Sequence, residues 1–151
     1  MNKLLVQAFK YGLVGIANTL LTAVVIWIIL KFGFGIRGEA DASSGQMTVA
    51  NFSGYALGVI NSFIFNRNWT FKSKGNWKVG FLKFIAVFAV CYSIQLLVVL
   101  LLNRYALIPS LSFEWIGQRY TVTSAYLCQL AGIVVYTVLN FFCNKYYTFK
   151  K

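Results

Sequence analysis

Four long apolar stretches, separated by clusters of charged residues, run through the sequence. The intervals without Asp, Glu, Lys or Arg contain 20 residues after Lys10, 25 after Asp41, 20 after Lys83 and 25 after Arg119. Because the apolar core of a bilayer is about 30 Å thick, a helix needs about 20 mainly apolar residues to cross it. The pattern therefore predicts four transmembrane helices, at residues 12–32, 48–66, 82–103 and 121–143.

The first apolar stretch follows a short basic start, Met1-Asn2-Lys3, as in a secretory signal peptide. It is longer than the apolar core of such a peptide, and no small-residue cleavage site follows it. We therefore expect the first helix to remain in the mature protein.

Basic residues are distributed unevenly among the segments that join the predicted helices. The segments on one side, which include both chain ends, hold ten basic residues and no acid. Those on the other side hold four basic residues and all three acids, Glu39, Asp41 and Glu114. Because short cytoplasmic loops carry an excess of Lys and Arg, we expect the N and C termini to be cytoplasmic. Each outer loop, about residues 33–46 and 103–119, has room for a short interfacial helix.

The second half of the sequence repeats the first. Residues 63–72 align with residues 141–150 at a constant offset of 78, and Lys10 aligns with Lys83. Each half contains two helices, so both have the same orientation in the membrane. We therefore expect an all-α integral membrane protein, one membrane domain over residues 1–151, built as two tandem two-helix hairpin repeats. Repeat 1 covers about residues 1–75 and repeat 2 about residues 76–151.

The composition limits the chemistry of the chain. Hydrophobic residues make up 59% and charged residues 11% of the 151 residues, and the mean hydropathy is +0.68. There is no histidine, and three carboxylates offer little for acid–base catalysis or metal binding. Cys91, Cys128 and Cys143 lie in apolar surroundings without the spacing of a disulfide framework, which favours a packing role. We expect a membrane protein that is not an enzyme, with no cofactor and no metal site.

The net charge of +11 is typical of a protein with an anionic partner. The basic residues are scattered along the predicted membrane boundaries, which favours anionic lipid or a lipid phosphate over nucleic acid. None of the charge-free intervals contains the buried carboxylate that proton- or sodium-coupled exporters use as a coupling site. A small multidrug exporter is therefore disfavoured, and any transport would be driven by the substrate gradient.

Several motifs, taken in order, resemble those of the GtrA-like family of small four-helix membrane proteins. The resemblance covers nearly the whole chain, and the chain departs from the family mainly in a longer first outer loop. The motifs are residues 9–19 (FKYGLVGIANT), Ala50-Asn51, residues 63–71 (FIFNRNWTF), and their counterparts at residues 81–84 and 140–149.

This resemblance implies a role in bacterial cell-surface polysaccharide assembly, in the cytoplasmic (inner) membrane. The implied activity is flipping of a polyprenyl-phosphate-linked sugar, such as an undecaprenyl-phosphate hexose, beside a membrane-associated glycosyltransferase. A second hypothesis is a non-transporting membrane anchor that recruits this glycosyltransferase through the basic inner loop, Lys72, Lys74 and Lys78.

For such a substrate, the repeated amide and cation pairs at the inner helix ends are candidate phosphate ligands. Arg offers a planar fork of donors and Lys a mobile point charge. The alternative is that these residues only anchor the helix ends at the membrane surface, together with neighbouring aromatic residues. The candidate phosphate-binding residues are Asn66, Arg67, Asn144, Lys145, Lys10 and Lys83.

Polar residues within the predicted spans recur at helical spacing, so we expect them to face the bundle interior. They could line a path for the sugar; the alternative is hydrogen bonding between helices, with close packing at Gly54 and Gly58. Four helices leave little room for a closed cavity, so the path requires either a lateral groove or a homo-oligomer. The candidate path residues are Asn18, Thr22, Asn51, Asn61, Gln95, Gln129, Tyr136 and Asn140; Tyr92 belongs to the same pattern.

Overall fold

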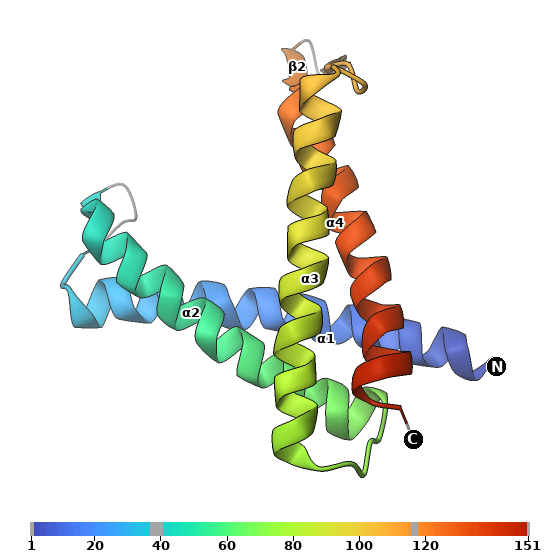
Figure 1. The fold of residues 1–151 in the computed structure, drawn as a ribbon. Helices are drawn as coiled ribbons and strands as arrows, with labels where there is room; N and C mark the ends of the chain where they lie inside the picture. The colour runs from blue at the N-terminus through green and yellow to red at the C-terminus, as the bar shows by residue number, and fades with distance from the viewer. Residues whose placement is uncertain (1, 37–40, 116–117, 151) are drawn as a thin grey trace. The chain divides into compact units, whose positions relative to one another are not determined.

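The computed structural model describes residues 2–36, 41–115 and 118–150, and four long helices dominate it (Figure 1). With their terminal turns they contain 25 to 31 residues and are apolar enough to cross a membrane. At 1.5 Å per residue each exceeds the bilayer core, so the protein is a multi-pass membrane protein. The helices and the π-helical turns that end three of them are α1 (Lys3–Ile28) with η1 (Ile29–Gly33), α2 (Ser44–Phe65) with η3 (Asn66–Thr70), α3 (Trp77–Arg104), and α4 (Ser124–Cys143) with η4 (Asn144–Thr148).

Three of the four helices begin before the predicted spans, and α4 begins after its predicted start. Helices α1 and α3 begin nine and five residues before the predicted spans. These extra turns carry Lys3, Lys10 and Lys78, whose long side chains can keep their charge in water while their stems follow an apolar surface. Helix α4 begins at Ser124 rather than at residue 121, because a strand occupies the preceding positions.

The chain divides into two compact units, Met1–Lys74 and Gly75–Lys150. In the first unit α1 and α2 form an antiparallel hairpin, and in the second α3 and α4 form another (Figure 1). The division lies between the two predicted repeats. Their common origin and their assembly into one membrane domain stay predictions.

Glycines allow the helices of each hairpin to approach closely. A Cβ at Gly54 would lie 3.1 Å from Ile26 Cγ1 of α1, and one at Gly58 would lie 2.9 Å from Thr22 Oγ1. On α4, a Cβ at Gly132 would lie 2.5 Å from Val99 Cγ2 of α3. The close packing predicted at Gly54 and Gly58 is confirmed. Small residues at such contacts are the usual means of joining helices in lipid, where the hydrophobic effect does not hold helices together.

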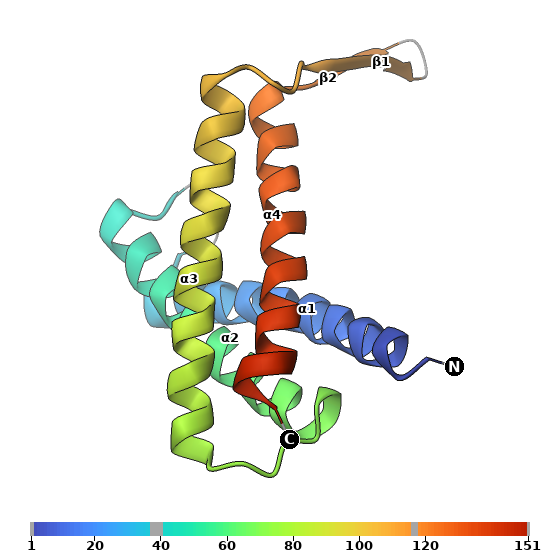
Figure 2. The same cartoon turned by 45° about the vertical axis from the view of Figure 1, so that its right-hand side comes forward.

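The second outer loop contains two strands, so the all-α prediction is wrong in this segment, as is the short interfacial helix considered there. Strand β1 (Leu111–Trp115) pairs with β2 (Gln118–Val122) in antiparallel register. Polar and apolar residues alternate through β1 and from Arg119 onward in β2, which is the period of a strand with two different faces. Figure 2 shows the strands running across the direction of α3 and α4. Within the first outer loop, residues 37–40 lie outside the described residues.

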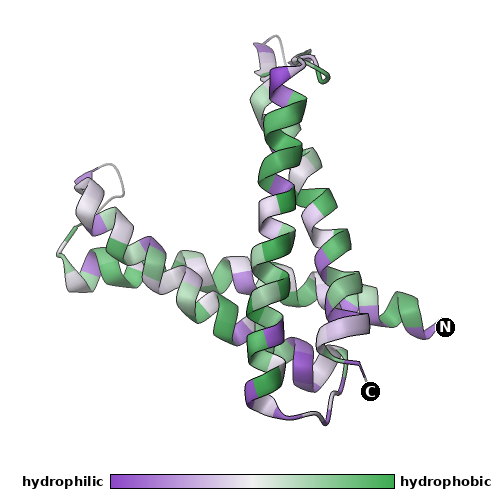
Figure 3. Ribbon diagram, viewed as in Figure 1, coloured by the Kyte–Doolittle hydropathy of each residue, from purple (hydrophilic) through white to green (hydrophobic). Residues whose placement is uncertain are grey.

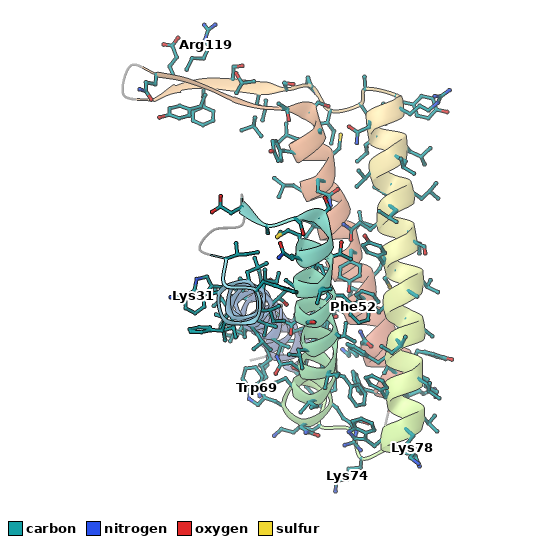
Figure 4. The ribbon with its side chains drawn as sticks, turned by 90° about the vertical axis from the view of Figure 1, so that its left-hand side faces the viewer. Lys31, Phe52, Trp69, Lys74, Lys78 and Arg119 are labelled. Carbon is teal, nitrogen blue, oxygen red and sulfur yellow. The ribbon has the colours of Figure 1, made fainter. Side chains whose placement is uncertain are left out.

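Hydrophobic residues predominate along the four helices (Figure 3), and many of their large apolar side chains are exposed. Phe52 on α2 is 75% exposed, and Figure 4 shows its side chain on the helix surface. A soluble protein rarely exposes so much contiguous apolar surface. Such a surface is suited to helices that cross a bilayer.

Candidate functional site

In the first unit, the beginning of α1 lies against the turn η3. The Nζ atom of Lys10 is 4.9 Å from the centre of the Trp69 ring, whose labelled side chain is visible in Figure 4. The next residue, Tyr11, places its ring 6.1 Å from that of Phe71. Because the face of an aromatic ring attracts a cation, these contacts hold the Lys10 charge beside η3.

Two polar side chains of η3 are buried next to this contact. Asn66 is 1% exposed and Thr70 is 4% exposed. The amide of Asn66 donates to Ser62 Oγ at 3.2 Å. Within the described part of the chain, Asn66 Oδ1 and Thr70 Oγ1 are buried without a hydrogen-bond partner. A buried unsatisfied polar atom costs about 1–3 kcal/mol, so this pair marks a place where a hydroxyl-rich ligand would gain binding energy.

We call Lys10, Asn66, Trp69 and Thr70 the first amide cluster. The turn itself brings the two buried side chains together, since Asn66 and Thr70 are four residues apart on one helical face. The Phe71 amide donates to the Asn66 carbonyl at 2.9 Å and closes the turn.

The second unit contains an equivalent group: a lysine over an aromatic ring of the terminal turn, with a buried asparagine and a buried threonine in the same turn. Lys83 Nζ is 5.0 Å from the centre of the Tyr147 ring, and the rings of Phe84 and Phe149 are 6.1 Å apart. Asn144 is fully buried and Thr148 is 7% exposed. Among the described residues, Thr148 Oγ1 is a further buried atom without a hydrogen-bond partner. Lys83, Asn144, Tyr147 and Thr148 form the second amide cluster.

A ladder of hydrogen bonds leads from the second amide cluster along α4. Asn144 Nδ2 donates to Asn140 Oδ1 at 2.9 Å, and Asn140 Nδ2 donates to the Tyr136 hydroxyl at 3.0 Å. Asn140 is 5% exposed. The ladder extends two helical turns from the helix end toward the middle of the span and presents only neutral polar groups.

In the first unit, the predicted path residues mainly join the two helices. Asn61 Nδ2 of α2 donates to Asn18 Oδ1 of α1 at 3.3 Å, and Thr22 Oγ1 donates to the Gly54 carbonyl at 3.4 Å. These contacts agree with the packing alternative for Asn18, Asn61 and Thr22. Asn51 is half-buried on α2.

The remaining candidates divide between buried and exposed positions. Gln95 is 6% exposed and lies against Gly132. Gln129 and Tyr92 are exposed on the α3–α4 hairpin, and the Tyr92 ring stacks on Phe88. Their expected orientation toward the bundle interior stays a prediction. The position of the facing helix decides which side of a span is buried, and helical spacing alone does not give it.

Arg67 and Lys145, which follow the two buried asparagines, are half-buried. Lys145 Nζ lies 5.1 Å from the centre of the Tyr146 ring. Of the four predicted cations, Lys10 contacts an aromatic ring of η3 and Lys83 one of η4, so each contact joins two helices.

The two buried threonines, Thr70 and Thr148, were not among the site residues predicted from the sequence. Thr70 and Thr148 lie in aromatic-rich segments that resemble a membrane-surface belt, so their burial was not expected. The signal was present as Asn-x-x-x-Thr-Phe in both halves, at residues 66–71 and 144–149. An anchoring belt needs neither the repeated asparagine nor the repeated threonine.

A comparison with curated proteins finds no match to this chain. The family model described as GtrA/DPMS, transmembrane domain, matches residues 10–149, which include both amide clusters, most of α1 and the whole of α2, α3 and α4. The chain belongs to the GtrA/DPMS transmembrane domain family.

Proposed function

We propose that the protein binds a polyprenyl-phosphate-linked sugar and translocates it across the bacterial cytoplasmic membrane for cell-surface polysaccharide glycosylation. Membership of the GtrA/DPMS family indicates a role among glycosylation-related membrane proteins. The observation that carries the proposal is the pair of buried oxygens of Asn66 and Thr70 that, within the described residues, have no hydrogen-bond partner; they belong to η3, the turn whose Trp69 ring contacts the Lys10 cation.

The chemistry of the first amide cluster suits a sugar phosphate. Asn66 Oδ1 accepts a hydrogen bond from a sugar hydroxyl, whereas the Thr70 hydroxyl can donate or accept. Lys10 and Arg67 supply positive charge for the phosphate, and hydrogen bonds to charged groups are the stronger class. The polyprenyl chain stays among the lipid tails, so the protein needs to accommodate only the head group.

The ladder from Asn144 to Tyr136 supports a neutral polar path within the second unit. Its amide and hydroxyl groups can exchange their mutual hydrogen bonds for bonds to sugar hydroxyls. The described spans carry no carboxylate, which fits movement down the substrate gradient rather than proton coupling. We place both termini in the cytoplasm, treat the protein as non-enzymatic, and propose a lateral groove or a homo-oligomer for the rest of the path.

Replacing both buried threonines by valine separates a binding role from a structural one. Thr70→Val with Thr148→Val removes two unsatisfied hydroxyls at nearly constant shape, so unfolding should require about 1–3 kcal/mol more free energy. Loss of one hydrogen bond to the ligand in each amide cluster should weaken binding at that cluster up to about tenfold. Unfolding by dodecyl sulfate and native mass spectrometry with an undecaprenyl-phosphate hexose measure the two effects.

Thr137→Val is the matched control, because its exposed hydroxyl donates to the Ile133 carbonyl at 2.8 Å within α4. It should leave the affinity unchanged. Lower stability with unchanged affinity in the double variant would contradict the proposal. So would wild-type binding no stronger than binding to phosphatidylglycerol.

The recruiting anchor makes a different prediction from the same protein. Lys72, Lys74 and Lys78 are exposed, and a docking surface for a membrane-associated glycosyltransferase would use them. Charge reversal at these three lysines should leave binding of the lipid-linked sugar within about twofold, since exposed charges contribute little. The anchor would be favoured over the transporter if the charge-reversed variant no longer co-purifies with the enzyme and the wild-type protein does not bind the lipid-linked sugar.

A further inference from the structure

The β1–β2 hairpin of the second unit has two chemically different faces. Cross-strand partners share a face, and neighbouring positions along a strand alternate between faces. The pairs Leu111–Val122 and Phe113–Tyr120 therefore lie on one face, and the rings of Phe113 and Tyr120 stack at 5.7 Å.

The opposite face of the hairpin is polar. The Ser112 and Thr121 hydroxyls are hydrogen-bonded at 3.1 Å. Arg119 Nη2 lies 3.6 Å from Glu114 Oε1, and both side chains are more than 70% exposed. This face forms its polar contacts across the strands and is suited to water.

The apolar face is exposed in the structure. Leu111 is 56%, Phe113 52% and Tyr120 45% exposed. An isolated two-stranded hairpin is at best marginally stable in water, and a hydrophobic face normally needs a cover. What covers this face follows from where the hairpin is attached.

The base of the hairpin is fixed to the end of a membrane-spanning helix. The Ser124 amide, at the start of α4, donates to Ser110 Oγ at 3.0 Å, and the Ser124 hydroxyl donates to the Ile108 carbonyl at 2.6 Å. The strands then run across the direction of α3 and α4 (Figure 2). Because α3 and α4 cross the bilayer, strands running across them lie along its surface.

The orientation of the two faces follows from the same attachment. Figure 4 shows the Arg119 side chain pointing away from the α3–α4 hairpin, whereas Lys78 lies at the opposite end of α3. The polar face therefore points away from the bilayer, and the face with Phe113 and Tyr120 points back toward it. Exposed Tyr105, Leu107 and Tyr126 continue the lipid-facing surface of the helices up to this level.

We propose that the β1–β2 hairpin is a membrane-surface element whose apolar face lies in the boundary between lipid head groups and acyl chains. Aromatic rings with a polar edge are enriched at that depth, and Tyr120 beside Phe113 has this character. The Glu114–Arg119 face contacts water and head groups. The partner of this surface is the lipid bilayer itself.

Spin labels on the two faces test the proposal in the whole protein. Cysteines replace Ser112, Phe113, Tyr120 or Thr121 one at a time in a chain whose native cysteines are replaced by alanine, and the protein is reconstituted into phosphatidylcholine–phosphatidylglycerol vesicles. For labels at positions 113 and 120, oxygen, which concentrates in lipid, should increase the relaxation rate several-fold more than an aqueous nickel chelate does. Labels at 112 and 121 should show the reverse.

Two results would overturn the proposal. Equal access of the nickel chelate to both faces would place the hairpin in water. Protection of positions 113 and 120 from both relaxing agents would show that protein, either another part of this chain or a second copy, covers the face. Circular dichroism of each variant checks the fold, and modification by a membrane-impermeant maleimide gives a second readout, with slow reaction expected at 113 and 120.

Discussion

Replacing Gly132 by leucine should force α3 and α4 apart and lower the free energy of unfolding by about 3 kcal/mol. A single Cβ at this position would lie 2.5 Å from Val99 Cγ2 and 3.2 Å from Gln95 Cγ. Valine is β-branched and holds one strongly preferred rotamer in a helix, so it cannot move aside cheaply. Unfolding by dodecyl sulfate, followed by circular dichroism in maltoside micelles, gives the measurement.

Two variants show whether the contact with Val99 is responsible. Gly15→Leu adds the same side chain on α1 at a position where a Cβ would meet no side chain and no backbone outside its own helical turns within 4 Å, and it should change stability by less than 1 kcal/mol. Combining Gly132→Ala with Val99→Ala should recover most of the stability that Gly132→Ala alone loses, because truncation at 99 makes room. Equal losses in the Gly132 and Gly15 variants would show that the contact is not what limits side-chain size on α4.

Removing the charge of both Lys10 and Lys83 should weaken binding of a polyprenyl-phosphate hexose at each amide cluster by about 10- to 100-fold. A hydrogen bond to a charged group contributes about 1.5–3 kcal/mol, and each 1.4 kcal/mol is a factor of ten in affinity. Glutamine keeps much of the side-chain length and its polarity, so Lys10→Gln with Lys83→Gln isolates the charge. Titration by native mass spectrometry gives the affinities.

Lys31→Gln is the matched control for this experiment. Lys31 also lies over an aromatic ring, with Nζ 4.6 Å from the centre of the Trp27 ring, but it belongs to η1 at the other end of the α1–α2 hairpin. Its replacement should leave affinity within twofold, because an exposed charge far from the ligand is screened by salt. Equal losses in the control and the double variant would indicate nonspecific attraction to anionic lipid.

The four spans could be predicted because charge is costly in a bilayer, so the intervals between charged residues mark the helices directly. The strands β1 and β2 could not be predicted by that signal, since Glu114 and Arg119 indicate only that the segment leaves the membrane. Their alternation of apolar and polar residues was present in the sequence, but each strand contains only five residues. Short alternating segments give a weaker signal than long apolar helices.

Of the candidate site, the two asparagines could be predicted from the sequence, whereas the contacts around them could not. Asn66 and Asn144 stood out because both halves carry them, and the structure buries both. The contacts of Lys10 with Trp69 and of Lys83 with Tyr147 depend on how two helices pack, and no spacing within one helix reports that. For the same reason helical spacing alone does not decide whether Gln129, which is exposed on the α3–α4 hairpin, faces the bundle interior.

The hydrogen bond between Asn61 and Asn18 also bears on how the chain enters the membrane during synthesis. The two residues are 43 positions apart, so at about 5–20 residues per second the ribosome adds Asn61 a few seconds after Asn18. Until then the Asn18 amide has no partner on α2 and would be unfavourable among acyl chains. The first two helices should therefore leave the insertion machinery as a pair, and a ribosome stalled before Asn61 should keep α1 in contact with the translocon.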